Sequence, residues 1–425
     1  MDAMSPVRPD VVVVGRRLEP EHHRLRDFLT RTAQEFEWVE AGTERADTLL
    51  AEHGAAAADL PLVVDREGPV TGATVERLIE AWHATAAPLR ARYDLAIVGG
   101  GPAGLAAAVY AASDGLATIL IERDVPGGQA SHTSLIENFF GFPGGIGGAE
   151  LARLAGRQAE GFGAELVFMR GVTGSAMLPG GGMQIELADG TAVGADVAIV
   201  SVGMDWRLLE VEGVEEGLGR GVYYGAGRSE AARCGGERVV VVGAGNSAGQ
   251  AVMNLADAGA QVTMLVRGSS LAKSMSAYLV ERIHAHDRIE VRLHTQVAAV
   301  ELAGGDLAAV TARDRDGRSE RLPAAALFLC LGGVPRTGWA AEAGVRLDPA
   351  GFVLTGPDLL AGGQRPEGWP LDRDPLALET SVPGVFAAGD VRSGSVKRVA
   401  GAVGDGAMAV ALAHRRLEEL ARSRA

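Results

Sequence analysis

The sequence predicts an α/β protein in which two dinucleotide-binding domains follow a smaller α/β domain. Two observations indicate the nucleotide domains: a glycine motif at 99–104 and a second at 243–248 each join an apolar strand to a helix. A third observation indicates the small domain, because strands and helices alternate on their own within residues 1–88. The length of 425 residues suits about three domains of ~150 residues each, and 59 glycines suit a fold rich in tight turns.

Composition argues against several classes of partner. The formal net charge of −14 disfavours nucleic acid and anionic membranes, because their phosphates repel an acidic surface. No apolar run reaches the ~18 residues of a membrane span, and the "VVVV" at 11–14 is too short for a signal peptide. We therefore expect a cytoplasmic protein. The two cysteines, Cys234 and Cys330, lie too far apart in sequence to indicate a disulfide framework or a metal site.

The small domain is predicted from three apolar strands and three helices. Leu25, Phe28 and Leu29 mark the apolar face of its first helix. The strands are expected at 10–15, 36–41 and 60–65, and the helices at 19–34, 45–54 and 74–84.

This β-α-β-α-β-α order resembles the thioredoxin and glutaredoxin fold. Pro61 stands where that fold keeps a cis-proline, and Glu19 to His22 ("EPEH") stand where a glutaredoxin has Cys-Pro-x-Cys. Both sulfurs are absent, and the disulfide chemistry of the fold needs a thiolate at a helix N-terminus. We therefore expect a redox-inactive docking domain. A metal site at Glu19 and His22 is the alternative, but two ligands make a poor one.

The first glycine motif lies in "YDLAIVGGGPAGLAAAVYAASDGLATILIER" at 93–123. Gly99 permits a tight turn, Gly101 lets the backbone approach a pyrophosphate, and Gly104 lets the helix lie close to the strand. The next strand ends in Glu122, which can accept hydrogen bonds from ribose hydroxyls. Strand, turn, helix, strand and acid together predict a dinucleotide site.

The second motif, Gly243-x-Gly245-x-x-Ala248, lies in a similar context, but its second strand ends in Arg267. An acid there would repel a 2′-phosphate, whereas Arg267 and Lys273 favour it, so this site is predicted to bind NADPH. The alternative is that Arg267 is a solvated strand end.

Two unlike dinucleotide sites in one chain indicate FAD at the first and NADPH at the second, which is the pairing of a flavoprotein oxidoreductase. A third stretch, 380–413, has Asp390 at the end of a strand and a helix beginning near Val399. The partial positive charge at that helix N-terminus could stabilise an anionic reduced flavin ring.

These stretches together resemble the low-molecular-weight thioredoxin reductases over about 91–425, through "GGGPAGLAAAVYAA", "GGQASHTSLIENFFGFPGGIGGAEL", "GAGNSAGQA" and "SVPGVFAAGDV". The resemblance implies a homodimer with nested domains: a discontinuous FAD domain at 91–206 and 326–425, and an NADPH domain inserted at 207–325. It implies flavin-site residues Gly99, Gly101, Pro102, Ala103, Gly104, Glu122, Arg123, Gly128, Gln129, Asn138, Gly389, Asp390, Arg398, Val399 and Ala400. At the NADPH site it implies Gly243, Gly245, Asn246, Ser247, Ala248, Arg267 and Lys273.

The chain departs from this family at its redox centre. The family's Cys-x-x-Cys pair should fall at positions 226 and 229, which hold Ala226 and Ser229. Cys234 lies five positions beyond, and Cys330, in the apolar run "ALFLCLGG", is expected to be a buried core thiol. A disulfide between Cys234 and Cys330 is the less favoured alternative.

We therefore expect an NADPH-dependent FAD oxidoreductase that passes electrons to an acceptor outside the chain, either a small molecule or a redox protein. No side chain stands out as an acid, base or nucleophile. Two alternatives remain: a disulfide reductase that uses the thiols of a partner or a small thiol, and a flavin-based redox sensor acting through the N-terminal domain.

Overall fold

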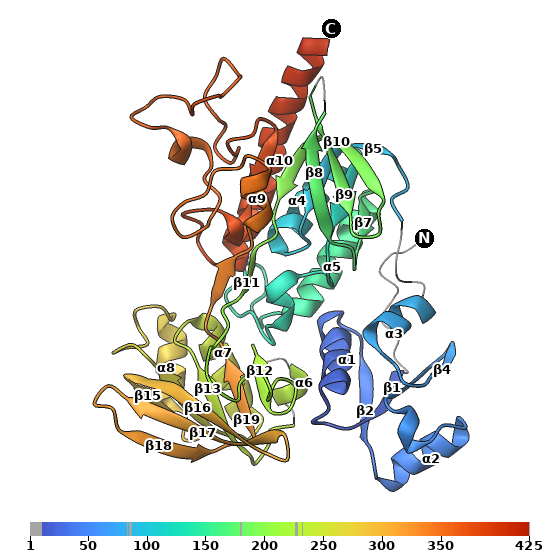
Figure 1. Ribbon diagram of the computed structural model, residues 1–425, viewed down its shortest axis with the longest axis vertical. Coiled ribbons are helices and arrows are strands. Elements are labelled where there is room, and N and C mark those ends of the chain that lie inside the picture. The colour runs from blue at the N-terminus through green and yellow to red at the C-terminus, as the bar shows by residue number, and fades with distance from the viewer. Residues whose placement is uncertain are drawn as a thin grey trace.

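The computed structural model describes residues 11–424 except 83, 85–86, 179–180, 226–227 and 232. The described residues form three units, each built on its own sheet (Figure 1). In this part of the chain no helix has both the length and the apolar character needed to cross a membrane.

The N-terminal unit is a four-stranded sheet in the order β2-β1-β3-β4. β1 and β2 run parallel, whereas β3 is antiparallel to β1 and β4 is antiparallel to β3. Leu25, Phe28 and Leu29 of α1 are buried against it, as the helix pattern predicts. The elements are β1 (Val11–Gly15), α1 (Pro20–Arg31), β2 (Phe36–Glu40), α2 (Glu44–Glu52), β3 (Leu62–Asp65), β4 (Gly68–Val70) and α3 (Val75–Ala81).

The second unit has five parallel strands in the order β7-β6-β5-β10-β21, and β9 and β8 extend the sheet from β10 in antiparallel fashion. Leu95 and Ile97 of β5 pack in one core with α4, α5 and α10, while Ala96 belongs to the core on the opposite side. The strands are β5 (Arg92–Val98), β6 (Thr118–Ile121), β7 (Glu165–Val167), β8 (Val172–Met177), β9 (Met183–Leu187), β10 (Ala192–Val200) and β21 (Val385–Ala387); the helices are α4 (Pro102–Ser113), α5 (Gly148–Gly161) and α10 (Val399–Arg424).

The third unit has five parallel strands in the order β12-β19-β13-β14-β15, with a three-stranded antiparallel sheet, β16-β17-β18, beside it. The strands are β12 (Val222–Tyr224), β13 (Arg238–Val242), β14 (Gln261–Val266), β15 (Ile289–Leu293), β16 (Thr295–Ala303), β17 (Asp306–Asp314), β18 (Ser319–Pro323) and β19 (Ala326–Leu329); the helices are α6 (Arg228–Ala231), α7 (Asn246–Asp257) and α8 (Ala277–Ala285).

The chain crosses between the second and third units through a two-stranded antiparallel ribbon of β11 (Met204–Trp206) and β20 (Gly333–Pro335). After β20 the short helix α9 (Gly338–Glu342) returns the chain to the second unit (Figure 1). β19 hydrogen-bonds between β12 and β13. Residues 326–329 therefore belong to the third sheet, whereas the sequence analysis assigned them to the FAD domain.

Candidate active site

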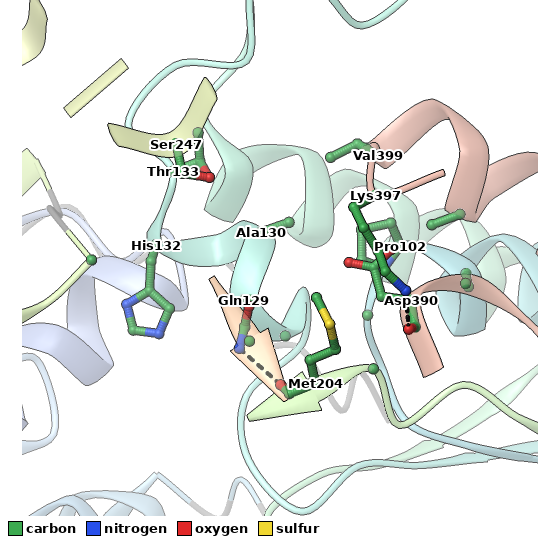
Figure 2. Close-up of a pocket in the computed structure, with 18 of the residues that line it drawn as sticks. Pro102, Gln129, Ala130, His132, Thr133, Met204, Ser247, Asp390, Lys397 and Val399 are labelled. Atoms are coloured by element: carbon green, nitrogen blue, oxygen red, sulfur yellow. Dashed lines mark hydrogen bonds between the residues drawn. The ribbon is translucent and has the colours of Figure 1, made fainter. Parts of the chain in front are cut away.

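A cavity of about 680 Å³ lies where the second and third units meet, and all three units contribute to its wall. We call it the cleft. Eleven of the residues expected at the flavin line it: Gly101, Pro102, Ala103, Glu122, Arg123, Gly128, Gln129, Gly389, Asp390, Arg398 and Val399. Figure 2 shows Pro102, Asp390, Lys397 and Val399 grouped on one side, with Gln129 and His132 further along the wall.

The first glycine turn has the geometry that its sequence predicts. A Cβ at Gly99, whose φ is +107°, would lie 2.4 Å from the carbonyl oxygen of Ser201. A Cβ at Gly104 would lie 1.9 Å from the carbonyl oxygen of Gly99, so only glycine lets α4 approach the strand. A Cβ at Gly101 meets nothing within 4 Å. Since α4 begins at the next residue, its positive N-terminal end faces open space that suits a phosphate.

The second glycine turn repeats this arrangement. Gly243 has φ +149°, and a Cβ there would lie 2.4 Å from the carbonyl oxygen of Cys330, whereas a Cβ at Gly245 meets nothing within 4 Å. α7 begins at Asn246. Of the residues expected at NADPH only Ser247 lines the cleft. Arg267 and Lys273 are exposed after β14.

Glu122 is buried at the end of β6, and burial raises its pKa. Its Oε2 accepts a hydrogen bond from the backbone N–H of Gly100 at 2.5 Å, and its Oε1 accepts one from that of Asp124 at 2.9 Å. The carboxylate thus fixes the glycine turn against β6. Each oxygen keeps a second lone pair, so Glu122 can still accept from a ligand hydroxyl in the cleft.

Asp390 is the clearest polar feature of the cleft wall. Burial raises its pKa, and its Oδ1 is buried without a hydrogen-bond partner among the described residues. Lys397 lies beside it and donates from Nζ to the backbone carbonyl oxygen of Asp390 at 2.5 Å. A buried acceptor without a donor is costly, and the hydroxyl of a bound sugar or ribitol chain would satisfy it. The residues present therefore fit a flavin nucleotide.

Four of the expected flavin residues do not line the cleft: Gly99 and Gly104, which belong to the first glycine turn, Asn138 and Ala400. Asn138 is exposed in the turn beyond the bridge between Ile136 and Ile146, and Ala400 lies outside the cleft lining. Gln129 does line the cleft, where its Nε2 donates to the backbone carbonyl oxygen of Met204 at 2.8 Å (Figure 2). This hydrogen bond joins the glycine-rich segment of the second unit to β11 in the ribbon.

Both cysteines are free thiols. Cys234 is buried, and burial raises its pKa to about 11; desolvation raises the pKa of Cys330 to about 12. Cys330 packs against the core of the third unit, but it is only half-buried and also lines the cleft, which corrects its expected role as a purely buried thiol. A raised pKa is the opposite of what a reactive thiolate needs. Ala226 and the side chain of Ser229 lie outside the described residues.

The sequence analysis missed the contribution of α1 to the cleft. Arg31 lines the cleft and pairs with Asp124 of the second unit at 2.7 Å. At the other end of the helix, His23 and Arg26 contact Glu230 of α6 at 3.3 and 3.4 Å. Figure 1 shows α1 beside α6.

The sequence did contain a signal for these contacts of α1 with the other two units. His23, Asp27 and Arg31 recur every fourth residue and so form a polar stripe on α1, apart from its apolar face. A polar stripe is ordinarily read as a solvated face, and only the fold shows that the other two units cover it.

The contact between Arg26 and Glu230 gives the first testable prediction. Arg26 is fully buried, so Glu230→Gln removes the carboxylate that balances a guanidinium inside the interface. Breaking a buried pair in this way costs about 3–5 kcal/mol, and we expect a clearly lower melting temperature. The matched control is Glu76→Gln. Glu76, on α3, is the exposed partner of Arg24 on the outer side of α1, and its loss should cost at most about 1 kcal/mol.

Acid unfolding separates this loss from a general packing defect. Burial raises the pKa of Glu230, but the hydrogen bond with His23 and the charges of Arg26 and Arg233 outweigh it and lower the pKa from 4.5 to about 2. Its contribution is therefore complete above pH 4.5 and lost as the pH falls toward 2. The free energies of unfolding of wild type and Glu230→Gln should differ most above pH 4.5 and become equal toward pH 2. An equal gap at every pH would contradict the assigned ion pair.

Comparison with known proteins identifies the class. The family model described as pyridine nucleotide-disulphide oxidoreductase matches residues 93–406, and the chain belongs to this family. Thioredoxin reductase from Bacillus subtilis (strain 168) is 30% identical over 329 residues, which are 77% of this chain and 96% of that protein. One component of the alkyl hydroperoxide reductase of Pseudomonas putida is 33% identical over 324 residues, which are 75% of this chain but only 56% of that protein.

Solved structures agree with this assignment. The thioredoxin reductase of T. acidophilum superposes with a TM-score of 0.67 at 29% identity, covering 79% of this chain and 100% of the other. The Lactococcus lactis thioredoxin reductase in its FR conformation gives the same TM-score, with 77% and 99% covered. The chain is thus a thioredoxin reductase-like enzyme, an NAD(P)H-dependent flavoprotein oxidoreductase.

Proposed function

We propose that this enzyme binds FAD in the cleft and NADPH at the second glycine turn, and that it passes electrons to an external acceptor without an internal redox disulfide. One observation carries the last point. The chain has two cysteines, both are free thiols, and burial raises the pKa of each. When bound, FAD supplies the redox chemistry, taking a hydride from the nicotinamide and giving up electrons to the acceptor.

Different residues of the cleft would hold different parts of the flavin nucleotide. The turn at Gly101 and the N-terminus of α4 would hold the pyrophosphate, and Glu122 the adenosine ribose. Asp390 would accept from a ribitol hydroxyl through its unpartnered Oδ1. α10 begins at Val399 on the cleft wall, and its positive N-terminal end would face the pyrimidine edge of the ring.

The N-terminus of α7 would hold the NADPH pyrophosphate in the same way, with Gly243, Gly245, Asn246, Ser247 and Ala248 forming the turn. Arg267 and Lys273 are exposed at the carboxyl end of β14, where the 2′-phosphate of a dinucleotide lies in such folds. Their positive charges support a preference for NADPH over NADH.

We also propose that the N-terminal unit is a thioredoxin-like domain without redox activity. Its sheet order β2-β1-β3-β4 and the cis bond between Leu60 and Pro61 support the likeness. His22, at the second sulfur position of a glutaredoxin, is buried, and its Nδ1 accepts a hydrogen bond from the backbone N–H of Arg16 at 2.8 Å. That position thus serves the local fold, and α1 provides the docking surface.

Anaerobic reduction tests the proposal. NADPH should bleach the visible absorbance of the bound flavin. Quinones, small disulfides and redox proteins are then added in turn, and the compound that restores the absorbance is the acceptor. The contacts of α1 with both nucleotide-binding units favour the redox sensor as a second candidate. A sensor would be reduced once and stop, whereas an enzyme turns over continuously with its acceptor.

A further inference from the structure

His132 lies on the cleft wall, within the stretch "GGQASHTSL" but not among the site residues that the resemblance implies. It ends the 3₁₀ helix Gly128–His132, and its ring meets that of Trp206 edge-on at a centroid distance of 5.5 Å. Gly225 also lines the cleft here, and a Cβ on it would lie 3.7 Å from the Cβ of His132. His132 therefore stands beside Gly225, the residue that directly follows β12.

The N-terminal unit supplies the partner of this histidine. Asp27 of α1 approaches its Nδ1 with Oδ1 at 3.5 Å. Arg31, one turn further along α1, holds the same carboxylate at 3.5 Å and is itself fixed by Asp124 at 2.7 Å and by the hydroxyl oxygen of Ser131 at 3.1 Å. Because Nδ1 faces Asp27, Nε2 is the nitrogen left for a ligand in the cleft.

We propose that His132 donates a proton to a small acceptor that takes up two electrons and two protons in the cleft, and that Asp27 is its positioning residue. This inference rests on the proposed function and narrows the class of acceptor. All three units wall the cleft, so an acceptor that reaches His132 inside it is a small molecule rather than a folded protein.

The proton balance requires such a donor. NADPH supplies a hydride, that is, two electrons and one proton, and becomes NADP⁺. The acceptor needs a second proton: a quinone gains two O–H bonds, and a disulfide loses its S–S bond and gains two S–H bonds. The imidazolium of His132 would give this proton from Nε2, become neutral imidazole, and be reprotonated from solvent.

The charges around the pair favour this role. Burial raises the pKa of Asp27, but the hydrogen bond and charge of His132, with the charges of Arg31 and His23, outweigh it and lower the pKa to about 2. Asp27 is therefore ionised at neutral pH, and its carboxylate faces Nδ1 of His132. The charged groups that face the pair are Arg31 and His23 on α1 and Asp124 after β6; Trp206, from β11, is uncharged.

The test separates steps that need the proton from steps that do not. Rapid mixing would follow flavin reduction by NADPH, then flavin reoxidation by menadione, by cystine and by ferricyanide, which takes single electrons without protons. In His132→Gln we expect reoxidation by menadione or cystine to slow by about a hundredfold or more. Reduction by NADPH and reoxidation by ferricyanide should stay within about twofold. The two proton-requiring probes distinguish a quinone from a disulfide as the acceptor.

Asp27→Asn should slow reoxidation by menadione and cystine less than His132→Gln does, and should leave reoxidation by ferricyanide within about twofold. Arg24→Gln, on the outer side of α1, is the matched control and should change none of these quantities.

Two results would overturn the inference: unchanged menadione and cystine reoxidation in His132→Gln, or an equal slowing with ferricyanide, which would indicate a structural role. A wild-type flavin that NADPH does not reduce would instead contradict the proposed function itself.

Discussion

The variant Gly101→Val is expected to fold and to purify without flavin. A Cβ at this position meets no protein atom within 4 Å, so the added methyl groups project into the cleft rather than into the core. The backbone is not in the left-handed region, since φ at this N-cap is −71°, and replacing a glycine N-cap costs only about 1 kcal/mol. The measurement is visible flavin absorbance per chain, together with the melting temperature.

Gly245→Val is the matched control, because a Cβ there is equally open and α7 begins at the next residue. It should purify yellow and resist reduction by NADPH, while dithionite still reduces it. A yellow Gly101→Val protein, or a colourless Gly245→Val protein, would contradict the assignment of the two turns. Gly104 offers no such test, because a Cβ there would lie 1.9 Å from a backbone oxygen and would disturb the fold itself.

Replacing both Arg267 and Lys273 with Gln should remove most of the preference for NADPH. Each positive charge would make a charge-assisted hydrogen bond to the 2′-phosphate, worth about 1.5–3 kcal/mol. NADH lacks that phosphate, so its use should change little. The ratio of kcat/KM for NADPH to that for NADH should fall by about one to several powers of ten.

The two single variants would apportion the effect between Arg267 and Lys273. Arg288 is an exposed basic residue just before β15, whereas Arg267 and Lys273 follow the carboxyl end of β14. Arg288→Gln therefore serves as a control for lost surface charge. An unchanged ratio in the double variant would mean that Arg267 is a solvated strand end and that coenzyme preference comes from elsewhere.

The features that the sequence predicted well depend on local geometry. Gly99 and Gly104 were expected to permit a turn and a close approach, and the distances that a Cβ would meet at each show why. Such requirements involve residues close together in the chain, so a motif conveys them. The strands of the small domain were likewise predicted from short local apolar runs, although the short strand β4 was not predicted.

The features that the sequence missed depend on contacts between distant segments. The apolar run containing β19 suits either parallel sheet, and only its pairing with β12 and β13 decides between them. Cys330 was expected in a core because its neighbours are apolar, yet it directly follows β19 and lines the cleft. The approach of Asp27 to His132 joins residues more than one hundred positions apart, and no local pattern links the two segments.

Anaerobic titration with NADPH shows whether electrons leave the flavin without passing through an internal disulfide. If the flavin is the sole redox centre, its visible absorbance should fall from the first addition and the titration should end at about one NADPH per FAD. The Cys234→Ser, Cys330→Ser double variant should give the same curve and keep turnover within a few-fold. The opposite result would be a wild type that consumes a second equivalent of NADPH, and a double variant that does not and turns over more than about tenfold more slowly. That result would show a catalytic cysteine and contradict electron transfer without an internal thiol centre.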